Sequence, residues 1–117
     1  MNKTEYAEFH KSCCNKMVEI AEQKNADYTG SSEDPFSNFT RVEALGICTT
    51  EQGFLTRMAD KLGRITSFSQ KGFLLVKDES VEDTLIDLAN YCILMSGYIK
   101  SKRVKVEKAK VRSEWLG

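Results

Sequence analysis

The feature that most constrains this chain is the stretch from Leu85 to Ile99, in which Asp87 is the only charged residue. Ser80 precedes it as a helix cap, with Asp83 in the first turn, where the helix dipole favours negative charge. A helix that is apolar on nearly all sides must be covered by other elements, so we predict a central, buried helix. A carboxylate at position 87 costs several kcal/mol unless a partner or a metal compensates it.

A first helix is predicted from about Thr4 to Gln23, because apolar residues recur there at spacings of three and four. This pattern gives one buried stripe: Tyr6, Phe9, Cys13, Met17 and Ile20. The next segment, Lys24 to Glu33, is rich in Gly, Ser, Asn and Asp, which favour turns. We therefore expect a loop after the first helix.

Two shorter helical patterns follow. Asp34 and Pro35 suit the start of the second helix, and Gly46 suits its end; its apolar face comprises Phe36, Phe39, Val42 and Leu45. The third helix begins at Thr49 or Thr50, since Thr49 and Gln52 have the spacing of a capping box. It reaches about Ser69, and its predicted core stripe is Leu55, Met58, Leu62 and Ile65.

The remaining segments carry weaker patterns. Lys71 to Val76 reads as a short extended segment or part of a hairpin, and residues after Lys100 alternate valine with basic residues, as in a helix or an edge strand. Both readings of this basic segment stay open. The sequence thus predicts an all-α, four-helix fold with a short extended segment before the last long helix. We assign one domain to residues 1–99 and a basic extension to residues 100–117.

Composition narrows the classes of function. The chain has 117 residues, with 17 basic and 17 acidic ones, so its net charge does not favour nucleic acid or a membrane surface as a partner. The N-terminus has no apolar run, and no stretch approaches the length of a membrane span. Four cysteines lack metal-ligand spacing, which indicates free thiols in a reducing compartment, and hence a cytoplasmic protein.

Common catalytic motifs are missing from the sequence. His10 is the only histidine, and we interpret it as a core or boundary residue beside the first apolar stripe. The sequence contains neither a P-loop nor a GxGxxG motif. Glu19 and Glu22 have the ExxE spacing of a metal site, but they face away from the stripe and are better explained as a solvated pair.

Two charged sets on helices are candidate site residues. Asp83, Asp87 and Tyr91 are spaced four apart, so they share one helix face, and two carboxylates one turn apart suit Mg²⁺. For Asp83 the alternative is a surface residue at a helix start. The second set lies on the third helix, away from the predicted stripe, and forms either a solvated ion-pair network or a phosphate clamp with Lys61 and Arg64 as donors; it comprises Arg57, Asp60, Lys61 and Arg64.

A third candidate set lies around the expected loop and mixes amide, acid, base and aromatic groups: Lys24, Asp27, Tyr28, Asn38 and Phe39. An asparagine can read a base edge, and an aromatic ring can stack on a base. The alternative is a capped helix start whose phenylalanines enter the core. We expect that alternative to hold for at least one of Phe36 and Phe39, because both fall on the helix stripe.

Four segments, in order, resemble a phage and bacterial family called the nucleotide modification associated domain: residues 24–28, 33–39, 57–65 and 79–91. The resemblance spans about residues 20–99. That family in turn looks like a distant relative of the MazG-like all-α pyrophosphatases, which cleave nucleoside triphosphates with Mg²⁺ held by an ExxE and an ExxD. Asp83 and Asp87 correspond to the second pair, with a spacing of four rather than three. In place of the first pair, the third helix offers Asp60, Lys61 and Arg64.

The resemblance implies a MazG-like bundle that binds a nucleotide and forms homo-oligomers, commonly dimers. If the protein is an enzyme, Asp60, Asp83 and Asp87 would hold Mg²⁺. Lys61 and Arg64 would hold phosphate oxygens, and Asn38 and Tyr28 would contact base or sugar. Two other hypotheses stay open. One is a non-catalytic protein that binds and sequesters a signalling nucleotide; if a phage encodes it, it would act in the host cytoplasm. The other is a protein-interaction module that uses the basic tail.

Overall fold

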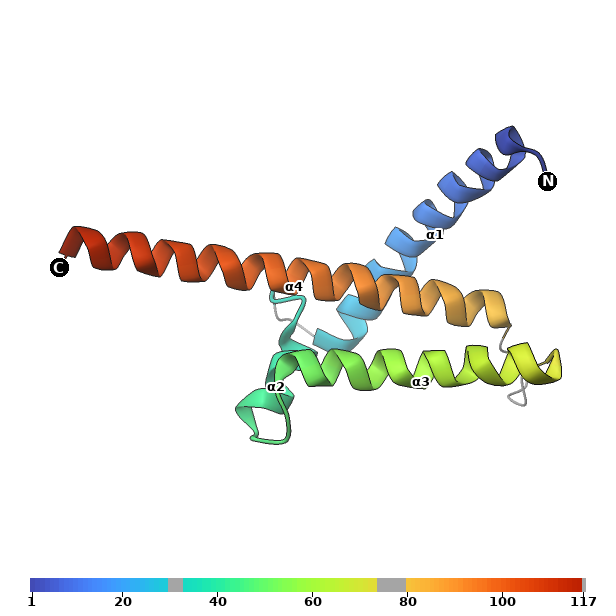
Figure 1. Cartoon of the computed structure of the whole chain (residues 1–117). Helices are drawn as coiled ribbons and strands as arrows, with labels where there is room; N and C mark the ends of the chain where they lie inside the picture. Colours follow the sequence, from blue (N-terminus) through green and yellow to red (C-terminus); the bar gives the residue numbers. More distant parts are fainter. Residues whose placement is uncertain (30–32, 74–79, 117) are drawn as a thin grey trace.

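The computed structural model describes residues 1–29, 33–73 and 80–116. Within these ranges the chain forms four α-helices in the order α1 (Lys3–Thr29), α2 (Ser37–Ala44), α3 (Thr50–Lys71) and α4 (Val81–Leu116) (Figure 1). The predicted all-α class and the number of helices are confirmed. The extended segment predicted at residues 71–76 lies mostly outside the described residues. In the described part of the chain, no helix is both long enough and apolar enough to cross a bilayer.

Helix α1 is longer than the sequence pattern predicts. The expected loop from Lys24 is wrong at its start, because the helix continues to Thr29. Residues 24–29 contain neither glycine nor proline, so nothing in the backbone stops the helix before position 30. At the other end, the Asn2 side chain accepts a hydrogen bond of 2.8 Å from the Glu5 backbone amide. The extension places Lys24 and Asn25 on α1 instead of in a loop.

Helix α2 begins two residues later than predicted. The Asp34 carboxylate accepts a hydrogen bond of 2.9 Å from the Phe36 amide in the turn before the helix. The prediction that Asp34 caps α2 is wrong, because the N-cap residue is Phe36 and no side chain caps it. Pro35 and Phe36 form a turn, and the helix starts at Ser37. Gly46 has a φ of 76°, a left-handed conformation that suits glycine and ends the helix as predicted. Leu45 is exposed, which corrects its assignment to the buried face.

Helix α3 has the predicted capping box at its start. The Thr49 hydroxyl accepts from the Gln52 amide at 3.1 Å, and the Gln52 side chain accepts from the Thr49 amide at 3.0 Å. The predicted core stripe is half wrong, since Leu55 and Leu62 are exposed. The face turned to the rest of the protein is rotated by about one residue; it carries Thr50, Phe54, Met58, Lys61, Ile65 and Phe68. Both sets have helical spacing, so periodicity alone did not separate them.

Helix α4 is capped as predicted, with the Ser80 hydroxyl accepting from the Asp83 amide at 3.1 Å. It continues without a break to Leu116, so the helical reading of the basic segment is right and the edge-strand reading is wrong. The assumed domain boundary at residue 100 therefore falls inside one helix. Leu85 and Ile93 are exposed, which corrects the prediction that this helix is covered on every side.

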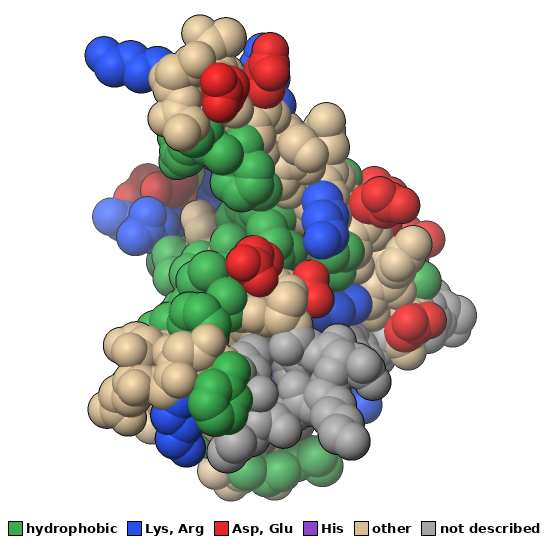
Figure 2. All heavy atoms as spheres, turned by 90° about the vertical axis from the view of Figure 1, so that its right-hand side faces the viewer, with side chains coloured by type: hydrophobic (Ala, Val, Ile, Leu, Met, Phe, Trp, Pro, Cys, Tyr) green, Lys and Arg blue, Asp and Glu red, His purple; other side chains and the backbone are tan. Residues whose placement is uncertain are grey.

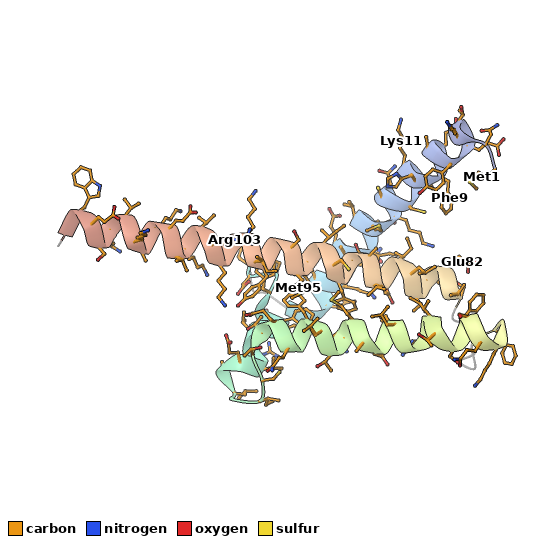
Figure 3. All side chains as sticks on the ribbon, viewed as in Figure 1. Met1, Phe9, Lys11, Glu82, Met95 and Arg103 are labelled. Atoms are coloured by element: carbon orange, nitrogen blue, oxygen red, sulfur yellow. The ribbon has the colours of Figure 1, made fainter. Side chains whose placement is uncertain are left out.

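The core lies where α2 and α3 meet α4. Helices α3 and α4 run side by side, and α1 crosses α4 (Figures 1 and 3). Phe54 is fully buried and stacks on Phe39, with ring centroids 4.0 Å apart and planes within 9°. Tyr98 of α4 lies against Phe54 and Phe36, at centroid distances of 5.8 Å each. Among the described residues, Phe39 and Phe54 are the only buried apolar side chains, which is a small core.

The chain is extended for its length. Its radius of gyration is 18.0 Å, whereas a compact domain of this length has about 13 Å. The N-terminal part of α1 and the C-terminal part of α4 project as two arms (Figure 1). Tyr6, Phe9 and His10 are exposed on the first arm, so their predicted positions in a buried stripe or its boundary are wrong for the single chain. Figure 2 shows hydrophobic side chains open on the surface between charged ones.

Candidate functional site

A small pocket of about 110 Å³ lies where α1, α3 and α4 face the start of α2. Its walls combine cationic, acidic, amide and apolar groups in a limited space. The lining residues are Ala21, Lys24 and Asn25 of α1, Pro35, Asn38 and Phe39 at the start of α2, Arg57 of α3, and Asp87, Asn90, Tyr91 and Leu94 of α4. The C-terminal part of α1 and the start of α2 thus come together beside α4.

Asp87 joins three helices through two ion pairs at the edge of this pocket. Its Oδ1 atom lies 2.8 Å from Nζ of Lys24, and its Oδ2 atom lies 3.3 Å from Nζ of Lys61. The side chains of Asp87 and Lys61 are only 17% and 14% exposed, whereas Lys24 is 41% exposed. The carboxylate in the apolar helix is therefore compensated by two cations. Lys61 faces inward, which corrects the prediction that it lies on the solvated side of α3.

Arg57 adds a third cation to this region. It is exposed, lines the pocket, and makes no ion pair with a carboxylate of the described residues. Among the described residues at this pocket, Lys24, Lys61 and Arg57 thus outnumber the Asp87 carboxylate. Because the surrounding walls are partly apolar, these charges are screened less than on an open surface. The local field favours an anionic ligand.

Three amides and two aromatic rings complete the walls. Asn90 donates a hydrogen bond of 3.2 Å from its side-chain nitrogen to the Met17 carbonyl, which fixes the amide between α4 and α1. Asn25 and Asn38 line the pocket from the α1 and α2 sides. The ring of Tyr91 meets Phe39 edge-on, at 6.1 Å and 85°. Amides give directional hydrogen bonds, and these rings give a rigid apolar wall for a flat group.

The structure brings together six of the residues selected from the sequence and leaves others apart. Those in the pocket wall are Lys24, Asn38, Phe39, Arg57, Asp87 and Tyr91, and Lys61 adjoins them through Asp87. Phe39 also belongs to the core, as one of the two phenylalanines was expected to. Asp27 and Arg64 are absent from the lining. The side chain of Tyr28 lies outside the described part of the chain.

The proposed metal ligands do not gather in one place. Asp83 is 3.6 Å from Lys16, and Asp60 is 3.4 Å from Arg64, one turn along α3. In the described ranges no group of three or more acidic, histidine or cysteine side chains is arranged to hold a metal ion. A hydrogen bond with the Ser80 side chain, together with the Lys16 charge, lowers the pKa of Asp83 below its ordinary value. Glu19 and Glu22 are exposed, in line with a solvated pair.

Five lining residues were absent from the sequence-based site: Ala21, Asn25, Pro35, Asn90 and Leu94. Asn90 did carry a signal, because an amide inside the apolar stretch must find a hydrogen-bond partner, as Asp87 must. It also follows Asp87 by three residues, which places both on one side of α4. Ala21 and Leu94 were not distinguishable from ordinary core residues.

The fold and the pocket define a class: a small all-α domain with a cation-rich, partly aromatic pocket between its helices. The chain belongs to the family described as Nucleotide modification associated domain 1, whose model matches residues 24–96. This range covers all of the pocket lining except Ala21. The chain matches no curated protein and no solved structure.

Proposed function

We propose that this protein binds a nucleotide in the pocket between α1, α3 and α4. The observation that carries the proposal is the excess of cations around Asp87 beside a wall of aromatic and amide groups. A nucleotide combines the two complementary features, since its phosphate is anionic and its base is flat, with hydrogen-bonding edges. The family description supports the same class of ligand.

Each part of the pocket has a role in this proposal. The Arg57 guanidinium and the Lys24 ammonium contact phosphate oxygens, because charge-assisted hydrogen bonds are the strongest that side chains offer. Asn38 and Asn25 bond to the edge of the base or to the sugar. Tyr91 and Phe39 supply the apolar wall, and Asp87 holds Lys24 and Lys61 in position. Lys61 adds positive charge behind Asp87 and lies too deep for a main phosphate contact.

Binding without hydrolysis fits the charges better than a Mg²⁺-dependent pyrophosphatase does. Two of the three candidate ligands, Asp60 and Asp83, pair with cations elsewhere, and Asp87 is held by two ammonium groups. Mg²⁺ prefers several oxygen ligands in a near-octahedral arrangement. The described carboxylates do not offer that set, and the proposed binding needs no metal-dependent step. These contacts support the hypothesis of a nucleotide-sequestering protein over that of a pyrophosphatase.

Calorimetric titration with a nucleoside, its monophosphate and its triphosphate, each with and without Mg²⁺, tests the proposal. We expect the phosphorylated forms to bind more tightly than the nucleoside. The ligand should be recovered intact after long incubation. Binding of the nucleoside and its phosphates with equal affinity would contradict the role of the cations. Release of pyrophosphate that requires Mg²⁺ would establish the pyrophosphatase hypothesis instead.

A further inference from the structure

The C-terminal part of α4 concentrates positive charge. Residues 100–116, which we name the basic arm, contain seven basic and two acidic residues, whereas residues 1–99 contain ten basic and fifteen acidic ones. The net charge of zero therefore hides an uneven distribution along the chain. The arm leaves the other helices near Arg103 and projects away from them (Figures 1 and 3). It also lies beyond the residues that the family model matches, so its role is a separate question.

The cations of the arm are open to solvent. All seven are exposed, and only Lys102 makes an ion pair with a carboxylate of the described residues, to Glu51 at 3.3 Å. Like charges three and four residues apart on a helix repel each other. This repulsion is not offset by packing, because residues 102–115 are all exposed. An anionic partner would relieve it, so the charges of the arm favour such a partner.

Three cations form one stripe along the arm, which we name the cationic stripe. Lys105, Lys108 and Arg112 are spaced three and four residues apart, so they lie on one face of the helix. Glu107 and Glu114 are seven residues apart and lie together on the opposite face. The arm therefore has a cationic face and a face that carries both of its acidic residues. A polyanion is attracted to the first face and repelled by the second.

The shape of the arm distinguishes between anionic partners. A lone α-helix is about 10–12 Å across, which matches the width of about 12 Å of the major groove of B-DNA. Phosphates line both edges of that groove, so long basic side chains on one helix can reach several of them. A helix that binds a membrane surface instead needs one broad apolar face. The arm lacks such a face, because Val104 and Val106 are two residues apart and lie on nearly opposite sides of the helix.

We propose that the basic arm binds double-stranded DNA, with the arm in the major groove and Glu107 and Glu114 facing away from the duplex. Lys105, Lys108 and Arg112 each make a charge-assisted hydrogen bond to a phosphate oxygen. Such contacts carry no sequence information, so the binding is independent of base sequence. This activity is separate from nucleotide binding, because the arm contributes no residue to the pocket lining.

Trp115 provides a native reporter for this contact. It is the only tryptophan of the chain, lies on the arm and is 85% exposed. Titration of a mixed-sequence DNA duplex into the full chain should change its fluorescence and give a binding constant at each of several salt concentrations. Three phosphate contacts predict a slope of about −2.7 for the logarithm of the binding constant against the logarithm of the salt concentration. Absence of binding at low salt, or a slope near zero, would overturn the proposal.

Two double variants that remove the same charge test the cationic stripe. K108Q/R112Q removes two stripe cations and should reduce the slope to about −0.9, the value for one remaining contact. R103Q/K110Q also removes one arginine and one lysine, but these lie on the side of Glu107, four residues before it and three after it. Its slope should stay close to the native value. Circular dichroism checks that both variants keep the native helicity. Equal slopes in the two variants would overturn the role of the stripe.

Other anionic partners are tested in the same titration. A single strand of the same sequence, and vesicles of phosphatidylserine and phosphatidylcholine, each replace the duplex. We expect weaker binding to both. Tighter binding to the single strand would show that the arm contacts unpaired bases rather than the groove of a duplex. Tighter binding to vesicles, with a blue shift of Trp115 emission, would show a membrane-surface helix. Either result would overturn the proposal.

Discussion

The Oδ1 atom of Asp87 on α4 lies 2.8 Å from the Nζ atom of Lys24, which lies 63 residues earlier on α1. The other carboxylate oxygen faces Lys61 of α3 at 3.3 Å. One side chain therefore ties together three of the four helices. It does so at the edge of the pocket, so the same contact supports the fold and orients two of the cations that favour an anion there.

Asp87→Asn tests how much the ion pairs of Asp87 contribute to the stability of the fold. The amide keeps the shape of the side chain but leaves Lys61, which is mostly buried, without its anion. We expect the free energy of unfolding in urea to fall by about 1.5–3 kcal/mol, the range for hydrogen bonds to charged groups. A double-mutant cycle with Lys61→Met should give a coupling energy clearly above zero. Coupling within error of zero would mean that the two side chains contribute independently.

Lys61→Met and Asp60→Asn form a matched pair of neighbours on α3. Lys61 points inward to Asp87, whereas Asp60 and Arg64 form an exposed pair one turn apart. We expect Lys61→Met to destabilise by about 1–3 kcal/mol and Asp60→Asn by no more than about 1 kcal/mol. Thermal or urea unfolding of both variants checks this ordering. Equal effects would show that Lys61 belongs to the solvated face that the sequence pattern predicted.

The capping box at α3 gives a test of local structure. Thr49→Ala removes the acceptor of the Gln52 amide, and caps of this kind contribute about 0.5–2 kcal/mol. Thr56→Ala is the control, because its hydroxyl bonds only to the Gln52 carbonyl within the same helix, at 2.8 Å. That change should be neutral or slightly stabilising, since alanine is the better helix former. Urea unfolding that ranked the two variants the other way would contradict the assignment of the helix start.

The pH dependence of Asp83 follows from its neighbours. The Ser80 hydrogen bond and the Lys16 charge lower its pKa in the folded state below the ordinary 3.8. A lowered folded-state pKa means that the stabilisation is present above pH 3.8 and is lost as the pH falls through the lowered value. NMR titration of the carboxyl carbon should give a midpoint below 3.8, and Ser80→Ala should raise it. A midpoint that is unchanged in Ser80→Ala would exclude the hydrogen bond as the cause.

The parts of the fold that the sequence predicted are those that depend on neighbours along the chain. The cap at Ser80, the capping box at Thr49 and the stop at Gly46 were each predicted from local residue chemistry and are present. The length of α1 was underestimated because Asn25 and Asp27 also favour turns, and only the packed structure decides between the two. The exposed Leu55 and Leu62 fit a helical stripe as well as Phe54 and Lys61 do, so the buried face depended on the position of α4.

The sequence predicted only part of the site, because the contacts between helices cannot be read from neighbours along the chain. Asp87 was predicted as a site residue because a charge in an apolar helix requires a partner. Its partners, Lys24 and Lys61, lie on other helices. Their identity required the three-dimensional arrangement. Asp83 lies one turn before Asp87 on the same helix, yet it pairs with Lys16 instead. A regular spacing along one helix therefore did not establish a shared site.

The most direct test of nucleotide binding in the pocket compares two arginines by calorimetry. Arg57 lines the pocket and makes no ion pair with a described carboxylate, whereas Arg41 lies on α2 outside the lining. With a nucleotide that binds the native chain, Arg57→Gln should weaken affinity about ten- to a hundredfold, because a charge-assisted contact to phosphate contributes about 1.5–3 kcal/mol. Arg41→Gln should leave the affinity unchanged. Equal affinity in Arg57→Gln and the native chain, or equal losses in both variants, would contradict nucleotide binding at this pocket.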